Sequence, residues 1–91
     1  MVEKDGQLVQ RAVDGDLGSF NCLTRKYQGA IYGLAYHWTH SFSDAEDITQ
    51  EALIQAFENL SQLRNPERFC AWLRSSARNI CKKRQREANN H

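Results

Sequence analysis

The chain has little of what interrupts a helix. Its 91 residues include one proline and five glycines, and runs of β-branched residues are few. Long stretches instead repeat apolar residues with the 3.6-residue period of a helix, which leaves no support for strands. The sequence therefore predicts an all-α fold.

Long apolar runs and a leader pattern are also missing. No run approaches the roughly 20 residues that cross a bilayer. The first residues, Met-Val-Glu-Lys-Asp, lack the basic-then-apolar order of a secretory signal. We expect a cytoplasmic protein with no membrane partner.

Cysteine is scarce and irregularly spaced. Cys22, Cys70 and Cys81 are odd in number and form no C-x-x-C pair, which argues against a disulfide framework and a standard zinc site. The spacing of His37 and His40, with Cys22 upstream, is common by chance. We expect reduced, partly buried thiols, no metal and no cofactor.

No catalytic constellation is recognisable. The sequence has no Ser-His-Asp or Cys-His signature, and Gly29 and Gly33 lie within a helical pattern rather than a phosphate-binding loop. The acids at positions 44, 46 and 47 suit the start of a helix better than a metal site. We expect a binding protein and not an enzyme.

Four helical segments account for the pattern. The first spans about 7–13, and Gly15 and Asp16 are expected to make a turn and cap the next helix. A third helix is expected to open on a Ser43–Glu46 capping box and reach about residue 60, and a fourth to span 66–86 after Asn65 as its cap. The second helix carries one sustained apolar stripe: Phe20, Leu23, Tyr27, Ile31, Leu34 and Trp38. The prediction is a monomer with a single compact four-helix domain over 1–91, one helix short and three longer, with frayed ends at 1–6 and 88–91.

Charge divides the chain in two. Residues 60–91 hold eight of the twelve Lys and Arg residues and two acids, a net charge of +6, whereas residues 1–59 hold four basic and nine acidic residues, a net charge of −5. A total of +1 hides this separation. The basic part predicts a polyanionic partner, and the acidic part a different one.

The third helix has a face that core packing does not explain. A wheel at about 100° per residue gathers its core residues on one arc: Ala45, Ile48, Ala52, Leu53, Ala56, Phe57 and Leu60. The opposite arc holds Asp47, Gln50, Glu51 and Glu58 around Ile54. A lone exposed apolar residue is usually unremarkable, but an apolar anchor ringed by acids also suits a small interface with a basic helix.

The fourth helix has a basic stripe. Its core arc is Phe69, Leu73, Ser76, Ala77 and Ile80, and its solvent side carries Arg74, Arg78, Lys82 and Arg86 at steps of four. This density, joined by Arg64 and Arg68, favours nucleic acid, although a basic helix end can also serve solubility.

Trp72 and Asn79 lie on the border between the core arc and the stripe, two turns apart. The position of Trp72 has two interpretations. It is either an aromatic at the core edge or, with Asn79, a platform that stacks and hydrogen-bonds a base. The loop 61–65 then offers a place for an unstacked base beside it.

Several pieces together resemble a known family. They are residues 44–53 (DAEDITQEAL), 69–74 (FCAWLR) and 77–79 (ARN), preceded by Gly15-Asp16-x-x-Ser19-Phe20 and the helix of Tyr27. In this order and spacing they are similar to region 2 of the extracytoplasmic-function (ECF) group of the bacterial sigma-70 family. The likeness runs from about residue 8 to residue 86.

The resemblance implies a role for each surface. In that family the helix bearing D-x-x-Q-E docks on the clamp helices of the RNA polymerase β′ subunit, which implies core-polymerase binding by Asp47, Gln50, Glu51 and Ile54. The loop and fourth helix capture flipped non-template bases of the −10 promoter element. This implies Leu63, Asn65, Trp72 and Asn79 at the bases, and Arg64, Arg74, Arg78, Lys82 and Arg86 along the phosphates.

Two features depart from the family pattern. Many relatives carry an aromatic residue where this chain has Leu63, which predicts weaker stacking or a different accepted base. The helix-turn-helix region 4 is absent from the 91 residues, so the chain is either a domain of a longer factor, which we expect, or a stand-alone remnant. Two other readings stay open: a small helical regulator that binds duplex DNA, and a module that binds an anti-sigma factor.

Overall fold

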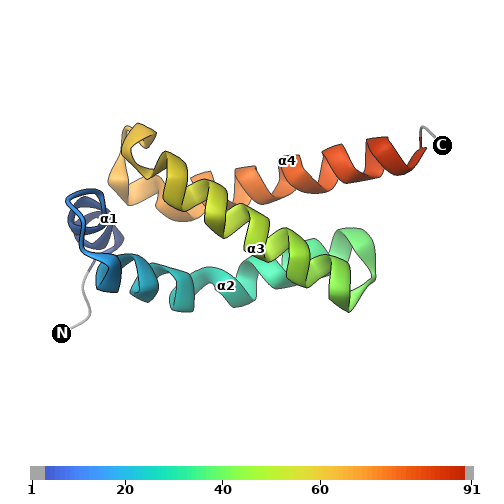
Figure 1. Cartoon of the computed structure of the whole chain (residues 1–91), viewed down its shortest axis with the longest axis horizontal. Coiled ribbons are helices and arrows are strands. Elements are labelled where there is room, and N and C mark those ends of the chain that lie inside the picture. Colours follow the sequence, from blue (N-terminus) through green and yellow to red (C-terminus); the bar gives the residue numbers. More distant parts are fainter. Residues whose placement is uncertain (1–3, 90–91) are drawn as a thin grey trace.

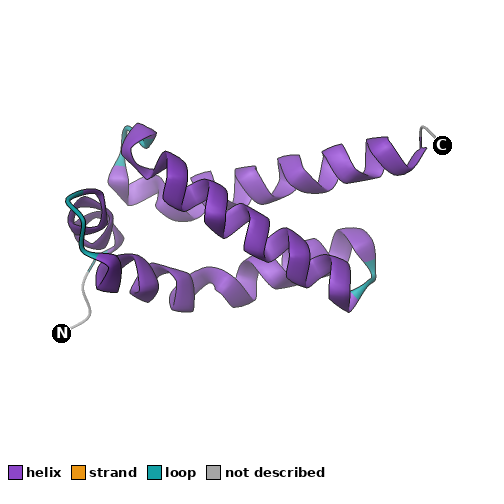
Figure 2. Cartoon of the chain, in the orientation of Figure 1, coloured by secondary structure: helices purple, strands orange, loops and turns teal. Residues whose placement is uncertain are grey.

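The described chain is helical apart from short turns (Figure 2). The structure is a computed structural model that describes residues 4–89. Its elements in chain order are α1 (Asp5–Val13), α2 (Leu17–Thr39), α3 (Phe42–Asn59), the 3-10 turns η1 (Leu60–Gln62) and η2 (Pro66–Arg68), and α4 (Phe69–Asn89). Within these residues no strand forms, and the predicted all-α, four-helix class is confirmed.

The helix α3 packs against both α2 and α4, which also contact each other. The short α1 crosses one end of this arrangement and contacts α2, η1, η2 and α4 (Figure 1). The largest fully buried side chains come from all four helices: Phe69, Leu23, Ile31, Ile48, Leu73 and Val9. Each such burial stabilises the fold by about 1.5–3 kcal/mol, so the core lies where the four helices meet.

The turn between α1 and α2 forms as predicted. Gly15 has a φ of 105°, a backbone conformation that glycine adopts without strain. Asp16 caps α2, because its carboxylate accepts hydrogen bonds from the backbone N–H and the hydroxyl of Ser19. These bonds favour the ionised carboxylate and lower the pKa of Asp16.

The N-terminus is more ordered than the sequence suggested. Asp5 and Gly6, expected in a frayed segment, form the first turn of α1. The Asp5 carboxylate accepts hydrogen bonds from Lys26 Nζ at 2.7 Å and from the hydroxyl of Tyr27. Gly6 is buried so close to Glu67 that a Cβ would lie 2.1 Å from its Oε1. Side-chain contacts with residues distant in sequence therefore hold α1 in place.

Replacing Asp5 by asparagine should destabilise the fold in a pH-dependent way. Burial opposes ionisation of Asp5, but the bonds from Lys26 and Tyr27 and the charge of Lys26 outweigh it, so its pKa is lowered from 3.8. A lowered folded-state pKa gives stability that is present above the unfolded value and lost as pH falls through the folded value. Because Lys26 is half exposed, we expect Asp5→Asn to cost about 1 kcal/mol at neutral pH. Thermal unfolding should show the gap between wild type and variant closing below pH 3.8.

The control is Asp14→Asn, which removes an equal charge from an exposed position at the end of α1. It should lower the melting temperature less than Asp5→Asn does at neutral pH. Equal melting temperatures for Asp5→Asn and wild type at neutral pH would contradict the account of how α1 is held.

The start of α3 differs from the prediction. The cap is Ser41, whose hydroxyl accepts from the backbone N–H of Asp44 at 3.3 Å, and the expected Ser43–Glu46 capping box does not form. His40 ends α2 in the left-handed conformation with a φ of 54°, which leaves Ser41 extended, as a capping residue must be. The helix therefore begins at Phe42, and Glu46 lies too far into it to complete the box.

The apolar stripe of α2 is confirmed only in part. Phe20, Leu23 and Ile31 are buried, but Trp38, the last member of the predicted stripe, is 37% exposed and lies outside the core. Ala35 takes the last core position of α2 and is fully buried. The indole of Trp38 lies one turn on and lines a surface cleft of about 220 Å³ with residues of α4.

The C-terminal prediction also needs correction. Ala88 and Asn89, expected to fray, continue α4. Pro66–Arg68 form the 3-10 turn η2, and α4 begins at Phe69, three residues later than expected. Asn65 is a capping residue as predicted, but it caps η2 and not α4, since its side-chain oxygen accepts from the backbone N–H of Glu67 at 3.1 Å. The remaining positions expected to fray, 1–3 and 90–91, lie outside the described residues.

Candidate protein-binding and nucleic-acid-binding surfaces

The first candidate surface is the solvent side of α3. Asp47, Gln50 and Ile54 are exposed, and Ile54 presents 55% of its surface to solvent. Glu51 is half-buried, and its Oε2 accepts from Arg84 Nη2 at 3.2 Å. These four residues, the α3 outer surface from here on, combine an apolar side chain with two acids and an amide.

Phe57 enlarges this surface and was missed by sequence reasoning. It was assigned to the core, but it is 48% exposed. Its ring packs edge-on against Phe20 of α2, with ring centroids 5.1 Å apart at 69°. It lies three positions after Ile54, so the two side chains are neighbours on the helix. Leu17, one turn before Phe20 on α2, is also 59% exposed.

The second candidate surface is the basic side of α4. Its four predicted members are all exposed: Arg74, Arg78, Lys82 and Arg86. Steps of four residues align them along one face of the helix. They are called the α4 stripe below. Arg84 lies outside it and pairs with Glu51.

Trp72 lies at the edge of the core, as the helical wheel predicted, whereas Asn79 lies in solvent. Trp72 is half-buried, packs against the core cluster and has its ring centroid 6.1 Å from that of Phe69. Asn79 is exposed, two turns further along α4. A half-buried indole keeps part of its surface accessible while the core fixes its orientation, as a base-stacking residue requires.

The residues of the loop before α4 differ in exposure and in their contacts. Arg64 and Asn65 are exposed, but the side-chain oxygen of Asn65 already holds the cap of η2. Leu63 is half-buried and packs against the core cluster. It also lines a cleft of about 300 Å³ on the side of α1, together with Val9, Val13 and Pro66. Leu63 and Asn65 therefore each have a local structural role, Leu63 in packing and Asn65 in capping. The base contacts that the resemblance implies would come in addition to these roles.

The two surfaces belong to adjacent helices. α3 packs against α4, and the Glu51–Arg84 ion pair crosses between them. Side-chain exposures of 43% for Glu51 and 39% for Arg84 leave this pair in solvent, where such pairs contribute about 0–1 kcal/mol. The contact therefore does not lock either side chain.

Nothing in the described residues points to a metal or redox site. Between residues 4 and 89 no three His, Cys, Asp or Glu side chains form a group that could hold a metal ion. Cys81 is buried, which raises the pKa of its thiol, and Cys70 is half-buried. Cys22 is exposed, contrary to the expectation of partial burial, because it lies on the solvent side of α2. No helix of this part of the chain has the length and hydropathy to cross a membrane.

Comparison with protein families gives a match over most of the chain. Residues 23–91 match the family model described as Sigma-70 region 2. The match covers α3, α4 and most of α2, and so contains both candidate surfaces. The chain therefore belongs to the sigma-70 family.

The curated relatives of the chain are RNA polymerase sigma factors, and several of them are named as ECF factors. The chain is 40% identical over 80 residues to the RNA polymerase sigma-H factor of Pseudomonas aeruginosa, covering 88% of this chain and 42% of that protein. It is 35% identical to the ECF RNA polymerase sigma-E factor of Haemophilus influenzae (86% and 41% covered) and 36% identical to that of Escherichia coli K12 (86% and 40%). The chain thus spans about two fifths of the length of these relatives. No solved structure matches it.

Proposed function

We propose that this chain is the region 2 domain of an ECF sigma factor, which joins core RNA polymerase to the −10 element of a promoter during initiation. In this proposal the α3 outer surface binds the clamp helices of the β′ subunit. The loop 61–65 and α4 hold the non-template strand. Such a protein acts in the cytoplasm, where polymerase and promoters are.

The proposal is supported by one observation above all. Both candidate surfaces are exposed at the same time, on adjacent helices of a small fold. A polymerase helix can lie on α3 while a DNA strand follows α4, because neither surface is consumed by packing. The membership of the chain in the sigma-70 family, over a segment that contains both helices, agrees with this use.

The polymerase side is a contact of mixed character. Ile54, with Phe57 beside it, offers an apolar centre, and Asp47, Gln50 and Glu51 surround it with acceptors. Interfaces of this kind draw most of their affinity from a few central apolar residues, while the charged rim sets the association rate and the orientation. Such a surface suits a helix that carries basic side chains.

The DNA side needs no bond-making. Flipping a base out of the duplex costs a few kcal/mol, and stacking on an aromatic ring returns about 1–3 kcal/mol per base. Trp72 supplies the ring in this proposal, Asn79 an amide for a base edge, and the α4 stripe with Arg64 the phosphate contacts. In this proposal Leu63 and Asn65, which belong to the loop 61–65, lie next to the flipped bases.

Asn79→Ala tests the role of α4 in base recognition. Asn79 is exposed, so alanine leaves no cavity and raises helix propensity. We expect binding of a −10 non-template single strand, chosen by selection from a random pool, to weaken about 5- to 150-fold, as the loss of a base-edge contact worth about 1–3 kcal/mol implies. Affinity for core polymerase should stay within about twofold of wild type. Fluorescence anisotropy with each partner measures both.

Trp72→Phe is the companion variant, because Trp72→Ala would also remove packing against Phe69. Phenylalanine keeps an aromatic face and should bind the strand more tightly than alanine at the same position. A matched duplex should bind more weakly than the single strand. Equal loss of strand and polymerase binding in Asn79→Ala would refute the division of labour, and preference for duplex would favour a duplex-reading regulator.

A further inference from the structure

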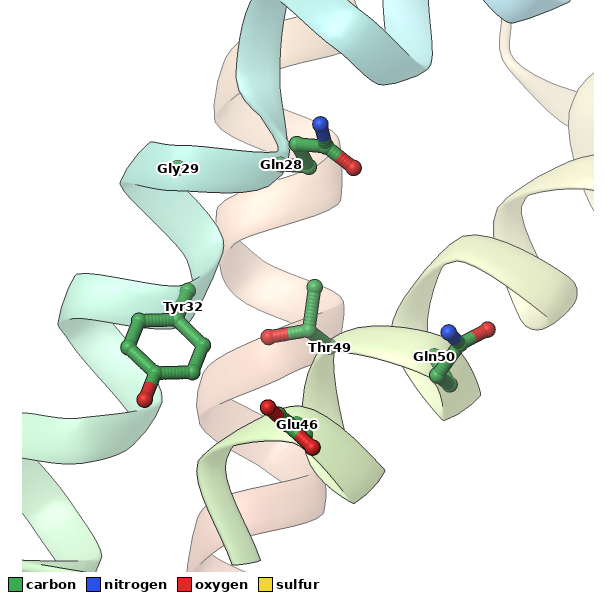
Figure 3. A pocket seen from close by; sticks show the side chains of 6 residues that line it. All are labelled: Gln28, Gly29, Tyr32, Glu46, Thr49 and Gln50. Carbon is green, nitrogen blue, oxygen red and sulfur yellow. The ribbon is translucent and has the colours of Figure 1, made fainter. Parts of the chain in front are cut away.

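A groove between α2 and α3 extends the α3 outer surface. Its volume is about 400 Å³, and its lining residues are Gln28, Gly29 and Tyr32 from α2 and Glu46, Thr49 and Gln50 from α3. Figure 3 shows the two sets of side chains on opposite walls, with Gln50 at one side. Because Gln50 also belongs to the α3 outer surface, a helix docked there would pass the mouth of this groove.

The lining of the groove is rich in acceptors. Glu46 is exposed and contributes a carboxylate, and Gln28 and Gln50 contribute amide oxygens. The hydroxyl of Thr49 donates to the backbone oxygen of Ala45 at 2.7 Å, so its oxygen can only accept from a ligand. Among residues 4–89, no lysine or arginine lines the groove. A cation therefore complements it.

One wall of the groove is open because a side chain is missing. A Cβ at Gly29 would meet nothing within 4 Å, so no packing requires a glycine there. Glycine inside a helix is destabilising relative to almost every other residue. The helix thus gives up stability at a position where any larger side chain would reduce the space in the groove. Tyr32, half-buried and one turn on, adds an aromatic ring to the same wall.

We propose that this groove receives the guanidinium group of an arginine that projects from the polymerase helix docked on the α3 outer surface. The inference rests on the proposed function and adds to it a site that shares only Gln50 with the D-x-x-Q-E residues. Arginine fits better than lysine, because its planar group can stack on the Tyr32 ring and donate several hydrogen bonds at once. Glu46 is its counter-charge, and Thr49 and Gln50 accept its remaining donors.

Filling the groove tests the site. Gly29→Leu places a side chain in the space, and Gly33→Leu is a matched control one turn along the same helix, since a Cβ at Gly33 also meets nothing within 4 Å. Both changes should raise the melting temperature, because leucine has the higher helix propensity. We expect Gly29→Leu to weaken binding to Pseudomonas aeruginosa core polymerase at least about tenfold, and Gly33→Leu to change it less than about twofold.

Glu46→Gln tests the chemistry of the occupant. Loss of the counter-charge should weaken core binding about tenfold and make the affinity less sensitive to salt. Tyr32→Phe, which keeps the ring, should bind within about threefold of wild type, and Tyr32→Leu should bind more weakly than Tyr32→Phe.

Each alternative outcome overturns the proposal. Equal binding by Gly29→Leu and Gly33→Leu means that the groove is empty in the complex. Unchanged or tighter binding by Glu46→Gln means that its occupant is not a cation. The proposed function survives both results if Ile54 and its neighbours remain necessary for core binding. If the wild-type chain does not bind core polymerase, the proposed function fails first.

Discussion

Ile54→Asn should lower the affinity of the chain for core polymerase about 100-fold or more. Removing a buried apolar side chain from an interface costs about 1.5–3 kcal/mol. Leaving an amide there without partners adds about 1–3 kcal/mol, and every 1.4 kcal/mol is tenfold in affinity. Because Ile54 is 55% exposed in the free chain, the substitution opens no cavity in the fold. The net charge does not change, so the loss should lie in the dissociation rate, with the association rate kept.

Gln55→Asn is the matched control, since it introduces the same residue into the same helix at an exposed neighbouring position. Both variants should have similar melting temperatures, and Gln55→Asn should bind core polymerase as wild type does. Biolayer interferometry separates the two rate constants. Wild-type affinity in Ile54→Asn would show that the α3 outer surface is not centred on this residue.

Ile54 is a sharper probe than Glu51, although the resemblance assigns both to the polymerase. Glu51→Lys would also break the pair with Arg84 and place two cations within reach of each other across α3 and α4. Its effects on polymerase and DNA would then be mixed. The sequence alone did not warn of this, because the two residues are 33 positions apart and meet only through the packing register of two helices.

The sequence pattern correctly predicted those features of the fold that depend on interactions between residues close in sequence. The apolar period of α2 correctly predicted that Phe20, Leu23 and Ile31 are buried. The residue types at Gly15, Asp16 and Asn65 correctly predicted a turn and two caps, because each of these depends on neighbours within a few residues. The start of α3 failed because Ser41 and Ser43 are equally good capping residues by sequence. The left-handed backbone conformation of His40 determines that Ser41 is the cap, and histidine as a residue type does not predict that conformation.

Exposure at the candidate surfaces was harder to predict. Phe57 lies at the edge of the core arc of α3, where the width of the neighbouring helix decides whether a ring is covered. In the fold the Phe57 ring packs edge-on against Phe20 of α2, and nearly half of the surface of Phe57 stays in solvent. The groove at Gly29 depends likewise on the spacing of α2 and α3. The exposure of the α4 stripe was predicted correctly, because its alignment depends only on the geometry of a single helix.

Removal of three cations from the α4 stripe should reduce single-strand binding about 100-fold at about 0.1 M salt. The variant is Arg74→Ala, Arg78→Ala and Lys82→Ala together. Each phosphate contact with a single strand contributes about 0.7 to the slope of log K against log salt, so the slope should become shallower by about 2. All three side chains are exposed, and alanine keeps the helix, so the fold should persist. Binding to core polymerase should change little, because these residues lie on α4 and not on the α3 outer surface.

A pair of single variants separates phosphate contact from loss of charge. Arg78→Ala and Arg25→Ala each remove one exposed cation, the first from the α4 stripe and the second from α2. The first should lower the slope by about 0.7 and the second should leave it near the wild-type value. Titrations between about 50 and 200 mM salt give both slopes. If the two variants shift the slope equally, DNA responds to the total charge of the chain, and α4 has no special place along the strand.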